Sequence, residues 1–253
     1  MTGSRRDRGV SETVAFVLVF SLIVTSVGLV TTAGVDSIRD VQESQQAESS
    51  VILMRAVGAG INDVATGARP RYRSSLSLAG GSIRVINETT VTIEVTNATG
   101  MPFVASYRPQ ALSYANDDRN VTYQSGLLAR GGERREAVLL VGSGLQCDPG
   151  RGYAAISIVR LQPNGSAALG GGSATIDASE RRLGPSMNQS GVEFPASRPH
   201  PNVTNVTITV DGPYEAAWRD ALTDRGFRSA GGSFYCPTER VIVNAPVVEV
   251  RLS

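Results

Sequence analysis

A long uncharged apolar run near the N-terminus constrains this chain more than any other feature. The run covers residues 14–34, VAFVLVFSLIVTSVGLVTTAG, and Arg5, Arg6 and Arg8 stand just before it. A helix of that length spans about 31 Å, close to the hydrocarbon thickness of a bilayer. We therefore expect one transmembrane helix over residues 14–34, in preference to a helix buried in a soluble domain.

The charges flanking the run predict its orientation. Basic residues cluster before it, and Arg39 is the only one close to its other end. The positive-inside rule then predicts a cytoplasmic N-terminus and an extracellular location for residues 36–253. A cleaved signal peptide is an alternative, because Thr31, Thr32 and Ala33 are small enough for cleavage before Gly34. The run exceeds the apolar region of about 7–15 residues in such peptides, which favours an uncleaved anchor.

Seven asparagines lie in N-x-S/T sequons, and all of them follow the apolar run. They are Asn87, Asn97, Asn120, Asn164, Asn188, Asn202 and Asn205. An acceptor asparagine must lie on an exposed segment of an exported protein, so this pattern favours glycosylation at some of these sites. The alternative is that threonine-rich strands create sequons by chance.

The two cysteines, Cys147 and Cys236, are both expected on the outer side. In an oxidising compartment they can form one disulfide, which would close a loop of about 90 residues and stabilise the fold by about 4–5 kcal/mol. Two free thiols are the alternative. The single histidine, His200, lies between two prolines and has no companion at ligand spacing. We therefore expect no metal site and no cofactor.

Charge and motifs argue against two classes of function. The net charge of +1 gives no electrostatic reason to expect a nucleic-acid partner. The sequence contains no nucleophile elbow, zinc-protease, Walker or dinucleotide-binding pattern. We therefore expect that the protein is not an enzyme.

The predicted fold class is α+β, with a long N-terminal helix over residues 10–66. Apolar residues recur at spacings of three and four after the membrane run, and no proline interrupts residues 35–66. A β-rich extracellular domain is expected over residues 67–182. It includes a hairpin within residues 82–95, where two alternating apolar segments flank Asn87 and Glu88.

The last part of the chain, residues 183–253, is expected to form a linker and a small C-terminal β-α-β-β module. Its first strand is expected at 203–210. A helix opened by Pro213 should follow, burying Trp218, Ala221 and Leu222.

The leader carries a resemblance to a known family. The segment Arg8-Gly9-Val10-Ser11-Glu12 leads directly into the apolar run. It resembles the class III, or prepilin-type, leader of archaeal type IV pilins and archaellins. More closely, RGVSETVAFVLVFSLI is similar to halophilic archaeal pilin-like membrane proteins of undefined role. The resemblance covers residues 8–34 and extends loosely to about residue 66.

The resemblance implies a mode of processing and a role. A membrane prepilin peptidase would remove residues 1–9 by cutting between Gly9 and Val10, and would leave the helix intact. The protein would then be a cell-surface subunit that assembles with other pilin-like subunits or acts in adhesion. Glu12 would pair with the new amino group of Val10 on a neighbour; a glutamate that lies at the membrane interface is the alternative. The alternative function is a membrane-anchored extracellular binding module that does not polymerise.

Overall fold

A computed structural model describes residues 6–98, 102–116, 119–132, 135–142, 144–181 and 200–253. Where side chains are described, 53% of the residues lie in strands and 24% in helices. The expected α+β class is therefore wrong, and the described chain is mainly β-sheet. The reason is that segments of period-two apolar alternation dominate residues 71–252. The chain divides into two compact units, Met1–Ser49 and Ser50–Ser253, which are treated separately below.

The N-terminal helix, α1, runs from Arg6 to Ala65, close to the expected bounds. No helix among the residues that the structure describes is long and apolar enough to cross a membrane. The transmembrane helix expected over residues 14–34 is thereby contradicted.

Helix α1 ends through backbone geometry at Gly67. This glycine has φ +74°, and its N–H donates to the carbonyl of Val64 over 3.1 Å. A residue in the left-handed region after the last helical turn directs the chain away from the axis. The guanidinium of Arg69 then pairs with Asp63, with 3.1 Å between Nε and Oδ2.

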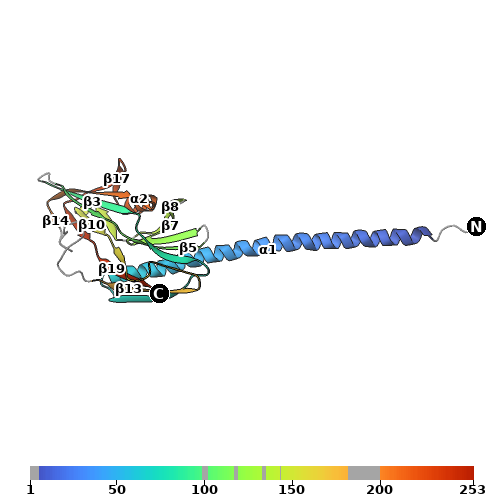
Figure 1. Cartoon of the computed structure of the whole chain (residues 1–253). Helices are drawn as coiled ribbons and strands as arrows, with labels where there is room; N and C mark the ends of the chain where they lie inside the picture. Colours follow the sequence, from blue (N-terminus) through green and yellow to red (C-terminus); the bar gives the residue numbers. More distant parts are fainter. Residues whose placement is uncertain (1–5, 99–101, 117–118, 133–134, 143, 182–199) are drawn as a thin grey trace, which may run out of the picture. The chain divides into compact units, whose positions relative to one another are not determined.

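The described strands form four sheets, each named below by one of its strands (Figure 1). The β19 sheet contains, in spatial order, β1 (Arg71–Ser77), β13 (Ser173–Glu180), β19 (Val247–Leu252) and β11 (Arg160–Pro163). The β10 sheet contains β14 (His200–Pro201), β18 (Arg240–Asn244), β10 (Tyr153–Ser157) and β9 (Leu145–Asp148). A short 3-10 turn, η1 (Pro149–Arg151), joins β9 to β10.

The two other sheets are larger. The β6 sheet contains β12 (Ala168–Gly170), β2 (Ser82–Ile86), β5 (Ala111–Asn116), β6 (Arg119–Gln124), β7 (Leu127–Gly132) and β8 (Arg135–Val141). The β15 sheet contains β16 (Arg228–Ala230), β17 (Ser233–Pro237), β15 (Val203–Asp211), β3 (Thr90–Asn97) and β4 (Phe103–Tyr107). The second helix, α2 (Glu215–Asp224), follows β15.

Strand pairing corrects two expectations. The expected hairpin within residues 82–95 does not form, because β2 pairs with β5 and β12 whereas β3 pairs with β15 and β4. The separate C-terminal module is also wrong. Its strands β15 and β19 pair with β3 and β13, so they lie inside sheets that earlier residues build. The expected strand at 203–210 and the helix that buries Trp218, Ala221 and Leu222 are confirmed.

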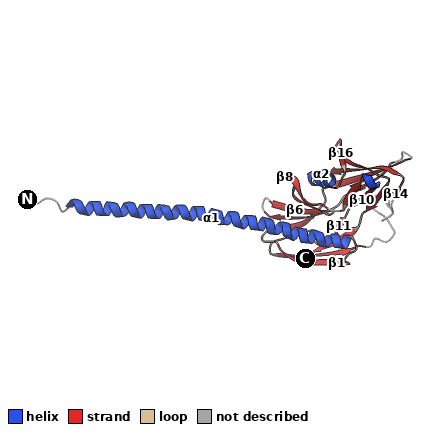
Figure 2. Cartoon of the chain, turned by 180° about the vertical axis from the view of Figure 1, so that it is seen from behind, coloured by secondary structure: helices blue, strands red, loops and turns tan. Residues whose placement is uncertain are grey.

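One apolar core encloses the last turns of α1 between the β19 and β6 sheets (Figure 2). Val57, Ile61 and Val64 of the helix are completely buried there. Two helix glycines allow the close approach of a ring from each side. A Cβ built on Gly58 would lie 2.7 Å from the ring of Tyr123, and one on Gly60 would lie 2.3 Å from the ring of Tyr72. Glycine lowers the stability of a helix, but at these two positions it allows the rings to pack against α1.

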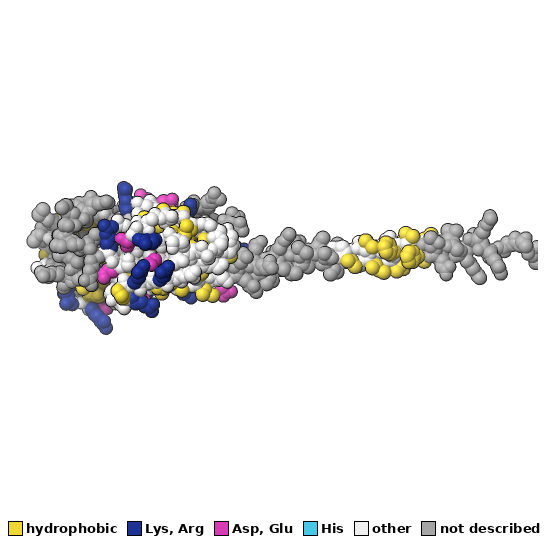
Figure 3. All heavy atoms as spheres, turned by 60° about the horizontal axis from the view of Figure 1, so that its bottom comes forward, with side chains coloured by type: hydrophobic (Ala, Val, Ile, Leu, Met, Phe, Trp, Pro, Cys, Tyr) yellow, Lys and Arg dark blue, Asp and Glu magenta, His cyan; other side chains and the backbone are white. Residues whose placement is uncertain are grey.

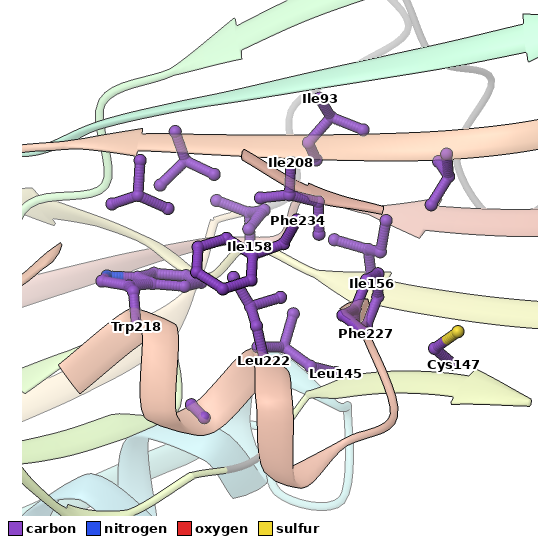
Figure 4. Close-up of a cluster of buried hydrophobic side chains, with 14 of the residues drawn as sticks. Ile93, Leu145, Cys147, Ile156, Ile158, Ile208, Trp218, Leu222, Phe227 and Phe234 are labelled. Carbon is purple, nitrogen blue, oxygen red and sulfur yellow. The ribbon is translucent and has the colours of Figure 1, made fainter. Parts of the chain in front are cut away.

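A second apolar core lies between the β15 and β10 sheets and α2. Figure 4 shows Trp218 and Leu222 of α2 beneath Ile208 and Phe234 of the β15 sheet. The indole N–H of Trp218 donates to Oε1 of Gln124 over 2.9 Å, which satisfies the one polar atom of this buried ring.

Candidate functional site

The described part of the apolar run presents an apolar surface on helix α1 (Figure 3). Its large apolar side chains are each 53–69% exposed, and they are Val14, Phe16, Val17, Leu18, Val19, Phe20, Leu22, Ile23, Val24 and Val27. Successive residues of a helix are rotated by about 100°, so this run of neighbours surrounds the helix axis. A helix that is apolar on all sides needs another apolar surface to cover it.

The polar side chains within this segment are few and short, namely Ser21, Thr25 and Ser26. The hydroxyl of Thr25 donates to the carbonyl of Ser21 over 2.8 Å, so it is satisfied by its own helix. Phe16 and Phe20 stack one turn apart, with ring centroids 6.1 Å from each other. The segment therefore offers mostly apolar side-chain contacts over about four turns.

The predicted leader residues belong to the same helix. Gly9, Val10 and Glu12 lie in the first turns of α1, and their side chains are outside the described residues. Cleavage between Gly9 and Val10 and the pairing of Glu12 stay predictions.

The disulfide between Cys147 and Cys236 is confirmed, with 5.8 Å between the two Cα atoms. It joins β9 of the β10 sheet to β17 of the β15 sheet and is buried in the core around α2. The N–H of Cys147 also donates to the carbonyl of Arg225 at the end of α2, over 2.8 Å. The bridge thus ties together two sheets and a helix.

The sequons differ in accessibility. Asn87 and Asn202 are exposed and lie outside strands. Asn97, Asn120 and Asn205 are half-buried in β3, β6 and β15, and Asn164 is half-buried next to β11, where its amide donates to Glu249. Asn188 lies outside the described residues. Glycosylation stays a prediction, and exposure favours the first two sites.

A charged network covers the outer face of the β19 sheet, seen as mixed blue and magenta side chains in Figure 3. Arg71 donates through Nε to Asp177 over 2.7 Å and through Nη2 to the second carboxylate oxygen. Arg73 and Arg251 stand opposite Asp177 on the neighbouring strands. The hydrogen bond from Arg71 and the charges of all three arginines lower the pKa of Asp177.

Metal-ligating residues do not gather in the part of the chain that the structure describes, since no group of three or more His, Cys, Asp and Glu side chains could hold an ion. His200, the histidine for which no companion ligand was expected, lies in β14. Its side chain is outside the described residues.

A pocket of about 470 Å³ lies in the unit Ser50–Ser253 and was not predicted from the sequence. Its walls come from the last turns of α1, the turn between β6 and β7, and the strand ends near Val141 and Val159. These segments are far apart along the chain. The sequence shows only the Ser125-Gly126 pair between two alternating segments. Such a pair indicates a turn, but it does not indicate a pocket.

Comparison with curated proteins found no match, and comparison with solved structures found none either. The match to a family extends over residues 8–252, which includes both the helix α1 from Arg8 onward and the β-rich unit. The chain therefore belongs to the family described as a family of unknown function, DUF7289.

Proposed function

We propose that the chain is a pilin-like cell-surface subunit whose N-terminal helix assembles with the same helix of other copies. The observation that carries this proposal is the exposed apolar surface that surrounds α1 over residues 14–28. Covering a Val, Leu, Ile or Phe side chain contributes about 1.5–3 kcal/mol. Copies of one helix, packed side by side, provide such a cover for each other.

The buried disulfide supports an extracellular location for the β-rich unit. Cys147 and Cys236 are joined inside the core around α2, and disulfides persist in oxidising compartments outside the cytosol. The seven sequons agree with the same location.

Removal of the leader would make helix packing easier. Cleavage between Gly9 and Val10 takes away Arg5, Arg6 and Arg8, whose like charges would repel one another when helices pack side by side. The glutamate Glu12 then stands two residues from a new positive amino group and can neutralise it on a neighbouring copy.

Processing is tested by the mass of the N-terminal peptide of protein isolated from its native cells. The proposal expects Val10 as the first residue. An intact leader, or a chain that starts at Gly34, would refute the pilin-like assignment.

Self-association is tested separately with cysteine cross-linking. Cys147 and Cys236 are bonded to each other, so Leu18→Cys introduces the only free thiol of the full-length chain. Mild oxidation is expected to give covalent dimers of this variant. Ser229→Cys, at an exposed position in β16, is the matched control and should stay monomeric. A Leu18→Cys chain that stays monomeric, and whose thiol is shielded from aqueous maleimide only when lipid is added, would show that lipid covers the segment instead of a second copy.

A further inference from the structure

The pocket beside α1 has the size and lining of a small-molecule site. Its volume of about 470 Å³ lies within the range of about 300–1,000 Å³ that is usual for ligand sites. Met54 and Ala59 of α1 line it from one side, and Leu128, Val141 and Val159 line it from the strands. Most of the contact it offers is therefore apolar.

The wall of the pocket is held rigidly by Tyr123. This tyrosine is 1% exposed, and its hydroxyl donates to Oδ1 of Asn62 on α1 over 2.7 Å. The same hydroxyl accepts a hydrogen bond from the backbone of Gly126, and burial raises the pKa of Tyr123. Helix, strand and turn are thus fixed to one another around the pocket, which is a property of preformed sites.

Ser125, in the turn between β6 and β7, departs from the chemistry that this turn favours. Its φ is +52°, and Gly126 follows with φ +87°. Two successive residues with positive φ define a type I′ turn, in which Asn or Gly is preferred at the first position. A serine there is strained, and strained residues concentrate at functional sites.

The hydroxyl of Ser125 adds a second, independent observation. Ser125 lines the pocket and is 1% exposed, and its Oγ is buried without a hydrogen-bond partner among the described residues. Buried hydroxyls in folded proteins almost always have a partner. A ligand oxygen bound in the pocket would supply one.

The charges near the pocket limit what the ligand can be. Asp63 and Arg55 both line it, but Asp63 is paired with Arg69 and Arg55 is exposed to solvent, which screens its charge. We infer that the pocket binds a small, uncharged and mostly apolar molecule that carries one hydrogen-bonding oxygen, with Ser125 as the residue that recognises this oxygen. This site is separate from the assembly surface of residues 14–28.

The inference is tested by photolabelling the full-length chain with two probes of nearly equal shape, 4-hydroxybenzophenone and benzophenone. Labelled residues are mapped by mass spectrometry, because residues 14–28 are a second place where apolar compounds can bind. We expect saturable labelling of the peptides that contain Met54 and Val141. The hydroxylated probe should reach half-saturation at a concentration roughly 3–10-fold lower, the value of one net hydrogen bond.

Matched variants separate the pocket from nonspecific binding. Ala59→Trp should fill the pocket and abolish labelling by both probes, whereas Ala56→Trp, at an exposed position of the same helix that does not line the pocket, should change neither. Ser125→Ala keeps the Cβ and the backbone geometry, so it should remove only the advantage of the hydroxylated probe.

Three outcomes would overturn the inference. Labelling confined to residues 14–28 would show that the pocket binds neither probe. Equal effects of Ala59→Trp and Ala56→Trp would place the probes elsewhere. Equal half-saturation of the two probes in both the parent chain and Ser125→Ala would show that Ser125 recognises no ligand oxygen.

Discussion

Gly58 of α1 lies against the ring of Tyr123 so closely that a Cβ on the glycine would stand 2.7 Å from Cδ2 of that ring. The ring cannot move aside easily, since it is completely enclosed and its hydroxyl is held by Asn62. The absence of a side chain at position 58 is therefore what allows the helix and the β6 sheet to meet.

We expect Gly58→Ala to destabilise the β-rich unit. Overpacking of this kind costs about 1–3 kcal/mol, which exceeds the gain of up to about 1 kcal/mol from replacing a helical glycine. Chemical denaturation should show the loss. Gly28→Ala is the control, because nothing lies within 4 Å of its added Cβ, and it should leave the unfolding of the β-rich unit unchanged. An unchanged or higher midpoint for Gly58→Ala would contradict this account of the packing.

Replacing both cysteines should reveal how much the cross-sheet bridge contributes. We expect the Cys147→Ala, Cys236→Ala double variant to lose about 2–5 kcal/mol of unfolding free energy, because its unfolded chain is less restricted. Urea unfolding with and without a reductant measures this loss. The reductant should weaken the parent protein and leave the double variant unaffected; equal stability of the parent and the double variant would show that the bridge adds nothing.

The stability of the β19 sheet should depend on pH through Asp177. In the folded protein Arg71 and its neighbours hold the pKa of Asp177 below the ordinary value of 3.8. The unfolded chain therefore takes up the proton first, so the stabilisation is present above about pH 4 and is lost as the pH falls through the folded pKa.

Asp177→Asn tests this dependence. The variant should unfold at a lower denaturant concentration than the parent at pH 6, and this difference should shrink steadily below pH 4. Asp220→Asn, an exposed carboxylate on α2, serves as the control and should show a smaller change with pH. If the stability difference between the parent and Asp177→Asn were the same at pH 6 as below pH 4, the negative charge of Asp177 would not be what stabilises the sheet.

The buried hydrogen bond between Trp218 and Gln124 should be required for full stability. Gln124→Leu leaves the indole N–H without its acceptor, and the amide of Gln124 no longer donates to the carbonyl of Pro109. We expect the free energy of unfolding to fall by about 1–3 kcal/mol. Denaturant unfolding monitored by far-UV circular dichroism measures this loss. In a Trp218→Phe background the same change should cost less, because the indole donor is gone; an equal cost would place the effect at Pro109.

Glycan occupancy should follow exposure. Asn87 and Asn202 are exposed outside strands, whereas the amide of Asn205 already donates to Thr207 over 3.1 Å and Oδ1 of Asn205 is buried. We expect glycopeptide mapping of native protein to find modification at Asn87 or Asn202 and unmodified Asn205. Modification of Asn205 alone would contradict this order.

Local features of the fold were predictable, and pairing between distant segments was not. The helix α2 followed from Pro213 and the spacing of Trp218, Ala221 and Leu222, because both signals lie within one short segment. The partner of β3 did not follow. Alternation of Val91, Ile93 and Val95 shows that one face is buried, but any other alternating strand would fit against it equally well.

The same reasoning applies to the candidate sites. The apolar run and the two cysteines are visible as residues, so the exposed apolar surface of α1 and the bridge could be anticipated. The pocket joins Ala59, Ser125 and Val159, and their proximity depends on how the sheets are ordered in space. The strain at Ser125 is likewise a backbone property that residue identity does not reveal.

The pairing of β3 with β15 also has a consequence for the speed of folding. Val91 stands opposite Val210, so the chain must bring very distant positions together before β3 and β15 can form hydrogen bonds with each other. The entropy lost in closing so large a loop comes early, and proteins dominated by such non-local contacts reach the native state slowly. Until the two strands pair, their apolar faces are open to solvent, which is the state in which such strands are most prone to aggregate.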